Sequence, residues 1–175
     1  GDLVCYALNG MQKWRRNVQE DFGDFCFQWT FSASPTLLSG KLFLPVLQRN
    51  EPVHGRGVQG ADSYLICMDF DTGKVLWKHK RPTTARKESR ESFATIIPYQ
   101  GELLVAGGDF LTCHDAADGA ELWRWGTWNP NHREEWWRLV PSPVVGNDRV
   151  SVCAPKNAPV YAVQVRSEEH TSELQ

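Results

Sequence analysis

The sequence has no apolar run that approaches the roughly 20 residues needed to cross a membrane. It also has no excess of one charge, since 19 Lys and Arg residues stand against 21 Asp and Glu residues. A nucleic-acid-binding domain needs a basic patch or stripe, which this balance does not indicate. The five cysteines form no CxxC pair and no Cys/His metal spacing, and their odd number gives no support to a disulfide framework. These absences argue against a membrane span, a nucleic-acid partner and a zinc site.

The sequence does contain a repeated segment in which a strand, a turn and a second strand end on tryptophan. The clearest copies are residues 66–77 and 112–123, which carry Asp, Gly and Trp in the same register. A shorter copy occupies residues 6–14, and a fourth begins at residues 160–164. Equivalent positions lie 60, 46 and 49 residues apart, at Ala7, Cys67, Cys113 and Ala162. Strand-only repeats of about 40–50 residues predict the blades of a β-propeller.

The residues of the repeated motif are those that a tight turn between docked strands requires. Asp69 and Asp115 end a strand, where a carboxylate can accept hydrogen bonds from backbone N–H groups of the turn. Gly73 and Gly119 stand where the turn needs a positive φ, which costs glycine little. A tryptophan closes each outer strand, and we expect its ring to wedge against the neighbouring blade: Trp14, Trp77 and Trp123. We interpret these seven residues as structural and not as a ligand site.

Residues 69–77 closely resemble the tryptophan-docking motif of the pyrroloquinoline-quinone-like (PQQ-like) β-propeller repeats, Ala-Leu-Asp-x-x-Thr-Gly-x-x-x-Trp. In the later copy Asp118 replaces the Thr, and the first copy lacks part of its turn. The resemblance covers about residues 1–165. It implies an all-β partial propeller of four-stranded antiparallel blades. The blades would be an outer half-blade at 1–17, whole blades at 28–80 and 92–125, and a partial blade at 138–165.

The two ends of the sequence depart from this pattern. Residue 1 lies in mid-blade and no initiator Met precedes it, so we expect the chain to be a piece of a longer protein whose other blades are missing. Residues 166–175 fit none of the repeats and resemble the translation of a sequencing-library adapter. We interpret them as an artefact and exclude them from the fold.

The segments before each motif align as inner strands of the blades and place further residues in register. A hydroxyl recurs where each inner strand begins, at Ser34, Thr95 and Ser142. Five residues earlier stand Trp29, Arg90 and Trp137. If these segments start from one face, they form a rim of aromatic, basic and hydroxyl groups at the channel mouth. The alternative is that the hydroxyls cap strand ends and the tryptophans pack between blades.

Two connections between strands carry unusual residues. Residues 125–138 contain four tryptophans and His132. Trp128 and His132 are therefore candidates for a platform that stacks on a planar ligand, although the same aromatic rings can bury the connection against the propeller. Residues 48–60 are rich in Gly and Pro and predict a flexible loop, in which His54 and Arg56 are more readily explained as solvated side chains than as ligand contacts.

Enzymatic activity is not indicated by these residues. Resemblance to PQQ-dependent dehydrogenases implies a Ca²⁺ site of Glu, Asn and Asp, an Asp base, a stacked Trp and a disulfide between adjacent cysteines. The sequence has no adjacent cysteines and no carboxylate cluster with the spacing of an oxygen cage. We therefore assign no catalytic residue, no metal ligand and no cofactor.

The resemblance favours a non-catalytic binding or scaffolding module that presents loops at the channel mouth to a protein or small-molecule ligand. Family resemblance places such a module in the periplasm or outside the cell. One alternative is a fragment of a PQQ- and Ca²⁺-dependent alcohol or sugar dehydrogenase. Another is the extracytoplasmic sensor domain of a multidomain protein. The fold alone does not decide among these, because one fold carries many functions.

Overall fold

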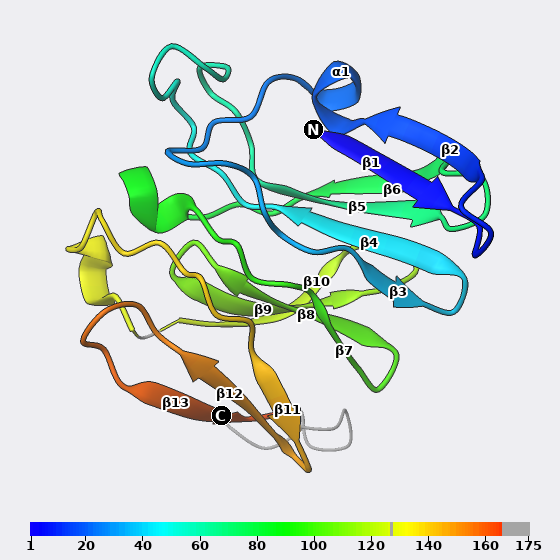
Figure 1. The fold of residues 1–175 in the computed structure, drawn as a ribbon. Helices are drawn as coiled ribbons and strands as arrows, with labels where there is room; N and C mark the ends of the chain where they lie inside the picture. Colours follow the sequence, from blue (N-terminus) through cyan, green and yellow to red (C-terminus); the bar gives the residue numbers. More distant parts are fainter. Residues whose placement is uncertain (127, 166–175) are drawn as a thin grey trace.

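The computed structural model describes residues 1–126 and 128–165, and its strands form four antiparallel sheets that lie side by side (Figure 1). The first sheet pairs β1 (Asp2–Tyr6) with β2 (Gln12–Asn17). The second has the order β3 (Thr36–Leu38), β4 (Lys41–Val46), β5 (Tyr64–Asp69) and β6 (Val75–Lys80). The third has the order β7 (Ile97–Tyr99), β8 (Glu102–Gly107), β9 (Phe110–Asp115) and β10 (Glu121–Trp125). The fourth contains β11 (Val144–Gly146), β12 (Arg149–Cys153) and β13 (Val160–Gln164).

Helical structure within the described residues is limited to α1 (Val18–Phe22) and the 3₁₀ turns η1 (Lys87–Arg90) and η2 (Pro130–His132). None of these helices is long and apolar enough to cross a membrane. The prediction of an all-β chain with four-stranded antiparallel sheets is confirmed. The segment that we interpreted as adapter-derived, 166–175, lies outside the described residues.

The core lies between neighbouring sheets, which explains why the middle strands are apolar on both faces. All of β5 except its last residue is buried, whereas the outer strand β6 alternates half-buried and exposed residues. One cluster joins the first and second sheets, a second joins the second and third, and a third joins the third and fourth. Cys67 and Cys113 are fully buried in these clusters, as small side chains in a repeated slot should be. All five cysteines are free.

The turns of the repeated motif have the predicted geometry. The Asp69 carboxylate accepts hydrogen bonds from the backbone N–H of Thr72 at 2.8 Å and from its hydroxyl at 2.6 Å. Asp115 accepts one from the N–H of Ala117 at 2.6 Å. Gly73 and Gly119 hold φ values of +70° and +82°. Each turn is therefore closed by its carboxylate and depends on glycine.

The same glycines also receive the tryptophan of the preceding sheet. The indole N–H of Trp14 donates to the carbonyl of Phe70 at 2.9 Å, and its ring covers Gly73 so closely that an added Cβ would lie 2.7 Å from it. Trp77 covers Gly119 in the same way, again at 2.7 Å. Trp123 packs against the cluster shared by the third and fourth sheets. The motif thus docks one blade on the next. Its glycine is required because a side chain there would collide with the tryptophan ring and because the turn needs a positive φ.

A buried histidine on β9 makes the stability of the fold sensitive to pH. Burial lowers the pKa of His114 from 6.5 to about 4, while the carbonyl of Gly119, 2.9 Å from Nδ1, partly opposes that shift. As the pH falls below 6.5, His114 becomes protonated in the unfolded chain but stays neutral in the folded chain. Its contribution to the free energy of unfolding is therefore fully present above pH 6.5 and is lost between about pH 6.5 and 4. We expect this residue to account for about 3 kcal/mol over that window.

This prediction is checked by measuring the free energy of unfolding in urea for the unmodified chain and for His114→Asn from pH 7 to pH 4. Asparagine retains a donor toward Gly119 but does not titrate, so the difference in unfolding free energy between the two proteins should shrink as the pH falls. Other carboxylates titrate equally in both proteins and cancel in this difference. A constant difference across the range would contradict a neutral buried His114.

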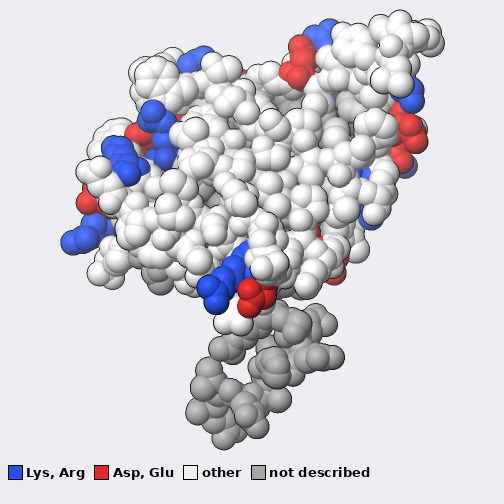
Figure 2. Space-filling view, turned by 60° about the horizontal axis from the view of Figure 1, so that its bottom comes forward, with Lys and Arg blue, Asp and Glu red and all other residues white. Residues whose placement is uncertain are grey.

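The side of the molecule that carries β11–β13 has a broad uncharged face (Figure 2). In the space-filling view the Lys, Arg, Asp and Glu side chains lie at its margins. Val144 on β11 and Val160 on β13 are exposed apolar residues of this sheet.

Candidate functional site

The long connections of the chain gather at one end of the sheets, and the β3–β4, β7–β8 and β11–β12 turns lie at the other (Figure 1). The β3–β4, β7–β8 and β11–β12 turns each have two residues, whereas the segments after β2, β4, β6 and β10 are much longer. We call the surface built by residues 24–31, 47–60, 81–92 and 128–139 the connection face. The segments that precede the inner strands start from this side of the molecule (Figure 1).

Backbone hydrogen bonds join three of these connections into one floor. The N–H of Ser92 donates to the carbonyl of Leu47 at 3.1 Å, and the N–H of Leu139 donates to the carbonyl of Glu91 at 3.1 Å. The N–H of Phe93 donates in turn to Leu139 at 2.9 Å. Because these segments follow β4 and β6 of the second sheet and β10 of the third, they fix one another across the sheets, and side chains above them stand on a defined backbone.

A buried ion pair lies within this floor. Arg49 Nε donates to Glu91 Oε1 at 2.5 Å, and the two side chains are only 6% and 0% exposed. The same carboxylate oxygen accepts the N–H of Gln28 at 3.0 Å, and Arg49 Nη2 donates to Gln28 Oε1 at 3.0 Å. Burial raises the pKa of Glu91, an effect that the bonds from Gln28 and Arg49 oppose. The pair links the connections that follow β2, β4 and β6.

A second polar cluster attaches η1 to the connection after β10. Arg138 forms an ion pair with the buried Glu88. The Ser89 hydroxyl donates to the carbonyl of Glu134 at 2.7 Å and accepts the N–H of Trp137 at 2.8 Å. Our expectation that residues 48–60 form a solvated loop is therefore wrong at its buried positions, Gln48, Arg49 and Val53.

Two tryptophans stand exposed on this floor, Trp136 beside two cations and Trp29 beside one. Trp136 is 50% exposed, with the guanidinium carbon of Arg49 5.8 Å and the ammonium of Lys87 5.3 Å from its ring centre. Trp29 is 59% exposed, with the guanidinium carbon of Arg138 5.8 Å from its ring centre. These cation–π contacts hold the rings while leaving much of their surface open.

The three predicted rim residues Trp29, Arg90 and Trp137 differ in their exposure to solvent. Trp29 is on the surface, as a rim requires. Arg90 turns inward and donates from Nη1 to the carbonyls of Thr83 and Ala85 at 3.4 and 3.3 Å, and burial lowers its pKa. Trp137 is half-buried, and the exposed ring is that of its neighbour Trp136, which sequence alignment missed. A one-residue offset of this kind arises because an irregular connection has no strand period to fix its register.

The predicted hydroxyl positions do not form a continuous ring. Ser34 is exposed, whereas the half-buried Ser142 accepts the N–H of Thr95 at 2.9 Å and so ties the third sheet to the fourth. Trp128 is buried in the core, 5.7 Å from the ring centre of Trp125. His132 instead contacts Thr84 and Asp109 at the edge of the face. Trp128 and His132 therefore do not share one stacking surface.

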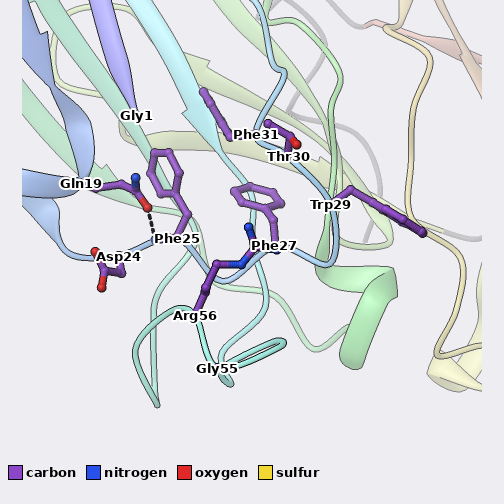
Figure 3. A pocket seen from close by; sticks show the side chains of 10 residues that line it. All are labelled: Gly1, Gln19, Asp24, Phe25, Phe27, Trp29, Thr30, Phe31, Gly55 and Arg56. Carbon is purple, nitrogen blue, oxygen red and sulfur yellow. Dashed lines mark hydrogen bonds between the residues drawn. The ribbon is translucent and has the colours of Figure 1, made fainter.

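A pocket of 330 Å³ opens beside Trp29 (Figure 3). Phe25, Phe27 and Phe31 line it and pack against one another, with ring centres 4.9 to 5.8 Å apart. Figure 3 shows Arg56 extending toward Phe27, while Trp29 points away from the phenylalanine rings. Arg56 and His54 are exposed, in agreement with their interpretation as solvated residues.

A Ca²⁺ site like that of the PQQ-dependent dehydrogenases needs a cluster of oxygen-donor side chains among residues 1–126 and 128–165. Within these ranges no group of three or more His, Cys, Asp or Glu side chains could hold a metal ion. The buried carboxylates of Glu88, Glu91 and Asp109 are each bonded to Arg, His or Asn side chains. Ca²⁺ takes six to eight oxygen ligands, so the described residues do not fit such a site.

Comparison of the chain with known proteins identifies its family. The family model described as outer membrane protein assembly factor BamB matches residues 1–174. A lanthanide-dependent methanol dehydrogenase of Methylorubrum extorquens is 31% identical over 71 residues, which are 37% of this chain and 12% of that protein.

Two solved structures show the same fold. The quinohemoprotein alcohol dehydrogenase ADHIIG of Pseudomonas putida HK5 aligns with a TM-score of 0.54 at 16% identity, over 81% of this chain and 20% of that one. The quinohemoprotein alcohol dehydrogenase of Comamonas testosteroni aligns with a TM-score of 0.50 at 18% identity, over 74% and 17%. The chain thus spans about an eighth to a fifth of these proteins. The predicted propeller architecture is confirmed, and the chain belongs to the PQQ-like β-propeller family, whose matching model is described as outer membrane protein assembly factor BamB.

Proposed function

We propose that the chain is a non-catalytic binding module whose connection face holds a protein partner. The observation that supports this most directly is the pair of exposed tryptophans, Trp29 and Trp136, held beside Arg138, Arg49 and Lys87. Tryptophan and arginine are the residues most enriched at the energetic centres of protein interfaces. A periplasmic or extracellular location is part of this proposal and is supported by the family description.

The floor beneath these rings suits binding better than bond making. Its carboxylates are engaged by internal partners: Glu91 by Arg49, and Glu88 by Arg138. Three connections, which follow β4, β6 and β10, are joined by backbone hydrogen bonds, so little chain ordering is left to oppose association. Such a surface presents aromatic anchors in fixed positions, which is the property that a scaffold needs.

Photo-crosslinking from the face itself provides the first test. A photoreactive phenylalanine analogue at position 136 or 29 should form adducts with one protein in the source cells, and the same analogue at Leu122, an exposed position on β10, should not. The identified partner is then purified and titrated with the chain. Trp136→Ala and Trp29→Ala should each weaken binding about tenfold or more, because each removes a hot-spot ring. Leu122→Ala should bind as the unmodified chain does.

Equal adducts at positions 122, 29 and 136 would contradict the proposal, as would equal affinities of the Trp variants and the unmodified chain. Thermal melting of each variant separates loss of binding from loss of fold. The other outcome is a small-molecule ligand in the pocket lined by Phe25, Phe27 and Phe31. The affinity for such a ligand would not change in Trp136→Ala.

A dehydrogenase fragment is the second candidate, favoured by the 31% identity to a lanthanide-dependent methanol dehydrogenase. Under this proposal, segments outside the 175 residues would supply the metal and cofactor ligands. Titration of the full-length protein with PQQ and Ca²⁺ or La³⁺, followed by tryptophan fluorescence, tests it. Saturable quenching that requires the metal ion would favour the enzyme, and its absence from a folded protein would exclude it.

A further inference from the structure

A hydroxyl, an imidazole and a carboxylate form a continuous line at the edge of the connection face. Thr84 Oγ1 lies 2.6 Å from His132 Nε2, and His132 Nδ1 lies 2.9 Å from Asp109 Oδ2. The three residues come from the connection after β6, from η2 and from the β8–β9 turn. A carboxylate only accepts hydrogen bonds, so Nδ1 carries a proton and donates to Asp109. In the neutral ring Nε2 is then the acceptor for the Thr84 hydroxyl.

The carboxylate end of this line is buried and held. The Asp109 side chain is 2% exposed, and its Oδ2 also accepts the amide N–H of Asn129 at 2.9 Å. The amide oxygen of Asn129 accepts the N–H of Glu134 at 3.0 Å, which orients the amide. Asp109 and His132 both have left-handed backbone, with φ of +69° and +51°. For Asp109 this φ is the geometry of the two-residue β8–β9 turn, which sets the position of its carboxylate.

The hydroxyl end is open. Thr84 is exposed, and the His132 side chain is 27% exposed. The backbone on both sides of Thr84 is fixed, because Arg90 Nη1 donates to the carbonyls of Thr83 and Ala85 and the Thr83 hydroxyl donates to Gly108 at 2.5 Å. A molecule in solution can therefore reach a hydroxyl whose base is already in place.

We infer that Thr84 is an activated nucleophile that accepts an acyl group from an activated acyl ester. Its Oγ1 attacks the carbonyl carbon and forms a new C–O bond while His132 Nε2 takes the hydroxyl proton. The bond from that carbon to the leaving alkoxide breaks, and the alkoxide takes the proton from the imidazolium, so an acyl-threonine and an alcohol result. Asp109 is a positioning residue that keeps the proton on Nδ1. Hydroxyl, imidazole and carboxylate in this order are the parts of an activated nucleophile.

Acylation by p-nitrophenyl acetate tests this inference on the full chain. Peptide mass spectrometry should find an acetyl group on Thr84, and surface lysines that react in every protein serve as the internal reference. Thr84→Val should abolish that adduct, and Thr84→Ser, which keeps the hydroxyl, should retain it. His132→Ala should slow labelling by about a hundredfold or more, the usual contribution of a positioned base. Added imidazole should restore it, which a merely structural role of His132 does not predict.

Two further variants complete the test. Asp109→Asn should slow labelling and, in ¹⁵N spectra of the imidazole, move the proton from Nδ1 to Nε2, because an amide can donate to Nδ1. His54→Ala, which removes an exposed imidazole elsewhere on the face, should label as the unmodified chain does. Circular dichroism verifies the fold of every protein. An unlabelled Thr84 in the folded unmodified chain, or equal labelling of His132→Ala, overturns the inference.

Discussion

Replacing Gly119 with alanine should destabilise the chain by about 3 kcal/mol. Two costs combine at this position. Its φ of +82° lies in the left-handed region, which costs an L-residue about 1–2 kcal/mol. The added Cβ would also lie 2.7 Å from Cζ3 of Trp77 and 2.7 Å from Cβ of His79, and overpacking of this kind costs about 1–3 kcal/mol. Urea unfolding followed by circular dichroism measures the sum.

Gly101 supplies the matched control for this substitution. Its φ is +89°, close to that of Gly119, but no atom lies within 4 Å of an added Cβ. Gly101→Ala should therefore show the backbone cost alone, about 1–2 kcal/mol. The excess loss in Gly119→Ala reports the contacts with Trp77 and His79, and removing the ring in Trp77→Ala should reduce it. Equal losses at Gly101 and Gly119 would show that Trp77 does not dock there.

The docking motif was predictable from sequence because its chemistry is local and repeated. Asp69, Thr72 and Gly73 build one turn within five residues, and the copy at Asp115 repeats the geometry. Alignment of the repeats also locates the inner strands, since each strand pairs with its neighbour along the chain. The sequence predicted that each tryptophan packs on the next blade. It did not predict that the ring covers the glycine of that blade, because this contact joins two segments far apart in sequence.

The connection face was predicted far less well, because its contacts join residues far apart in sequence. Arg49 and Glu91 are 42 residues apart, and each stands in a segment whose polar composition is typical of solvated loops. Arg90 lines up with Trp29 in sequence but turns toward backbone carbonyls. Trp136, and not Trp137, carries the open ring. No local sequence pattern shows which of these side chains are buried and which are exposed. Their burial depends on where residues distant in sequence come to lie in the fold.

Replacing Arg49 with methionine should cost about 3–5 kcal/mol, because Glu91 would remain buried without its cation. Glu91→Leu should cost a similar amount by leaving the guanidinium unpaired. The double variant should recover much of either loss, since apolar side chains of similar volume avoid the desolvation of both charges. Arg15→Met is the control: Arg15 and Asp2 form an exposed pair at 2.7 Å, and breaking it should leave the free energy of unfolding nearly unchanged.

The pH dependence of Arg49→Met distinguishes a buried charge from a simple loss of packing. Burial already raises the pKa of Glu91, and removing Arg49 takes away groups that oppose this shift. A carboxyl whose folded pKa is raised above its unfolded value binds more protons when folded, so its contribution to stability is present at low pH and is lost as the pH rises through the folded pKa. Arg49→Met should therefore regain stability relative to the unmodified chain as the pH is lowered from 7 toward 4, whereas Arg49→Met/Glu91→Leu should not. A deficit of Arg49→Met that stays constant with pH would mean that the methylenes of Arg49, and not its charge, hold the three connections together.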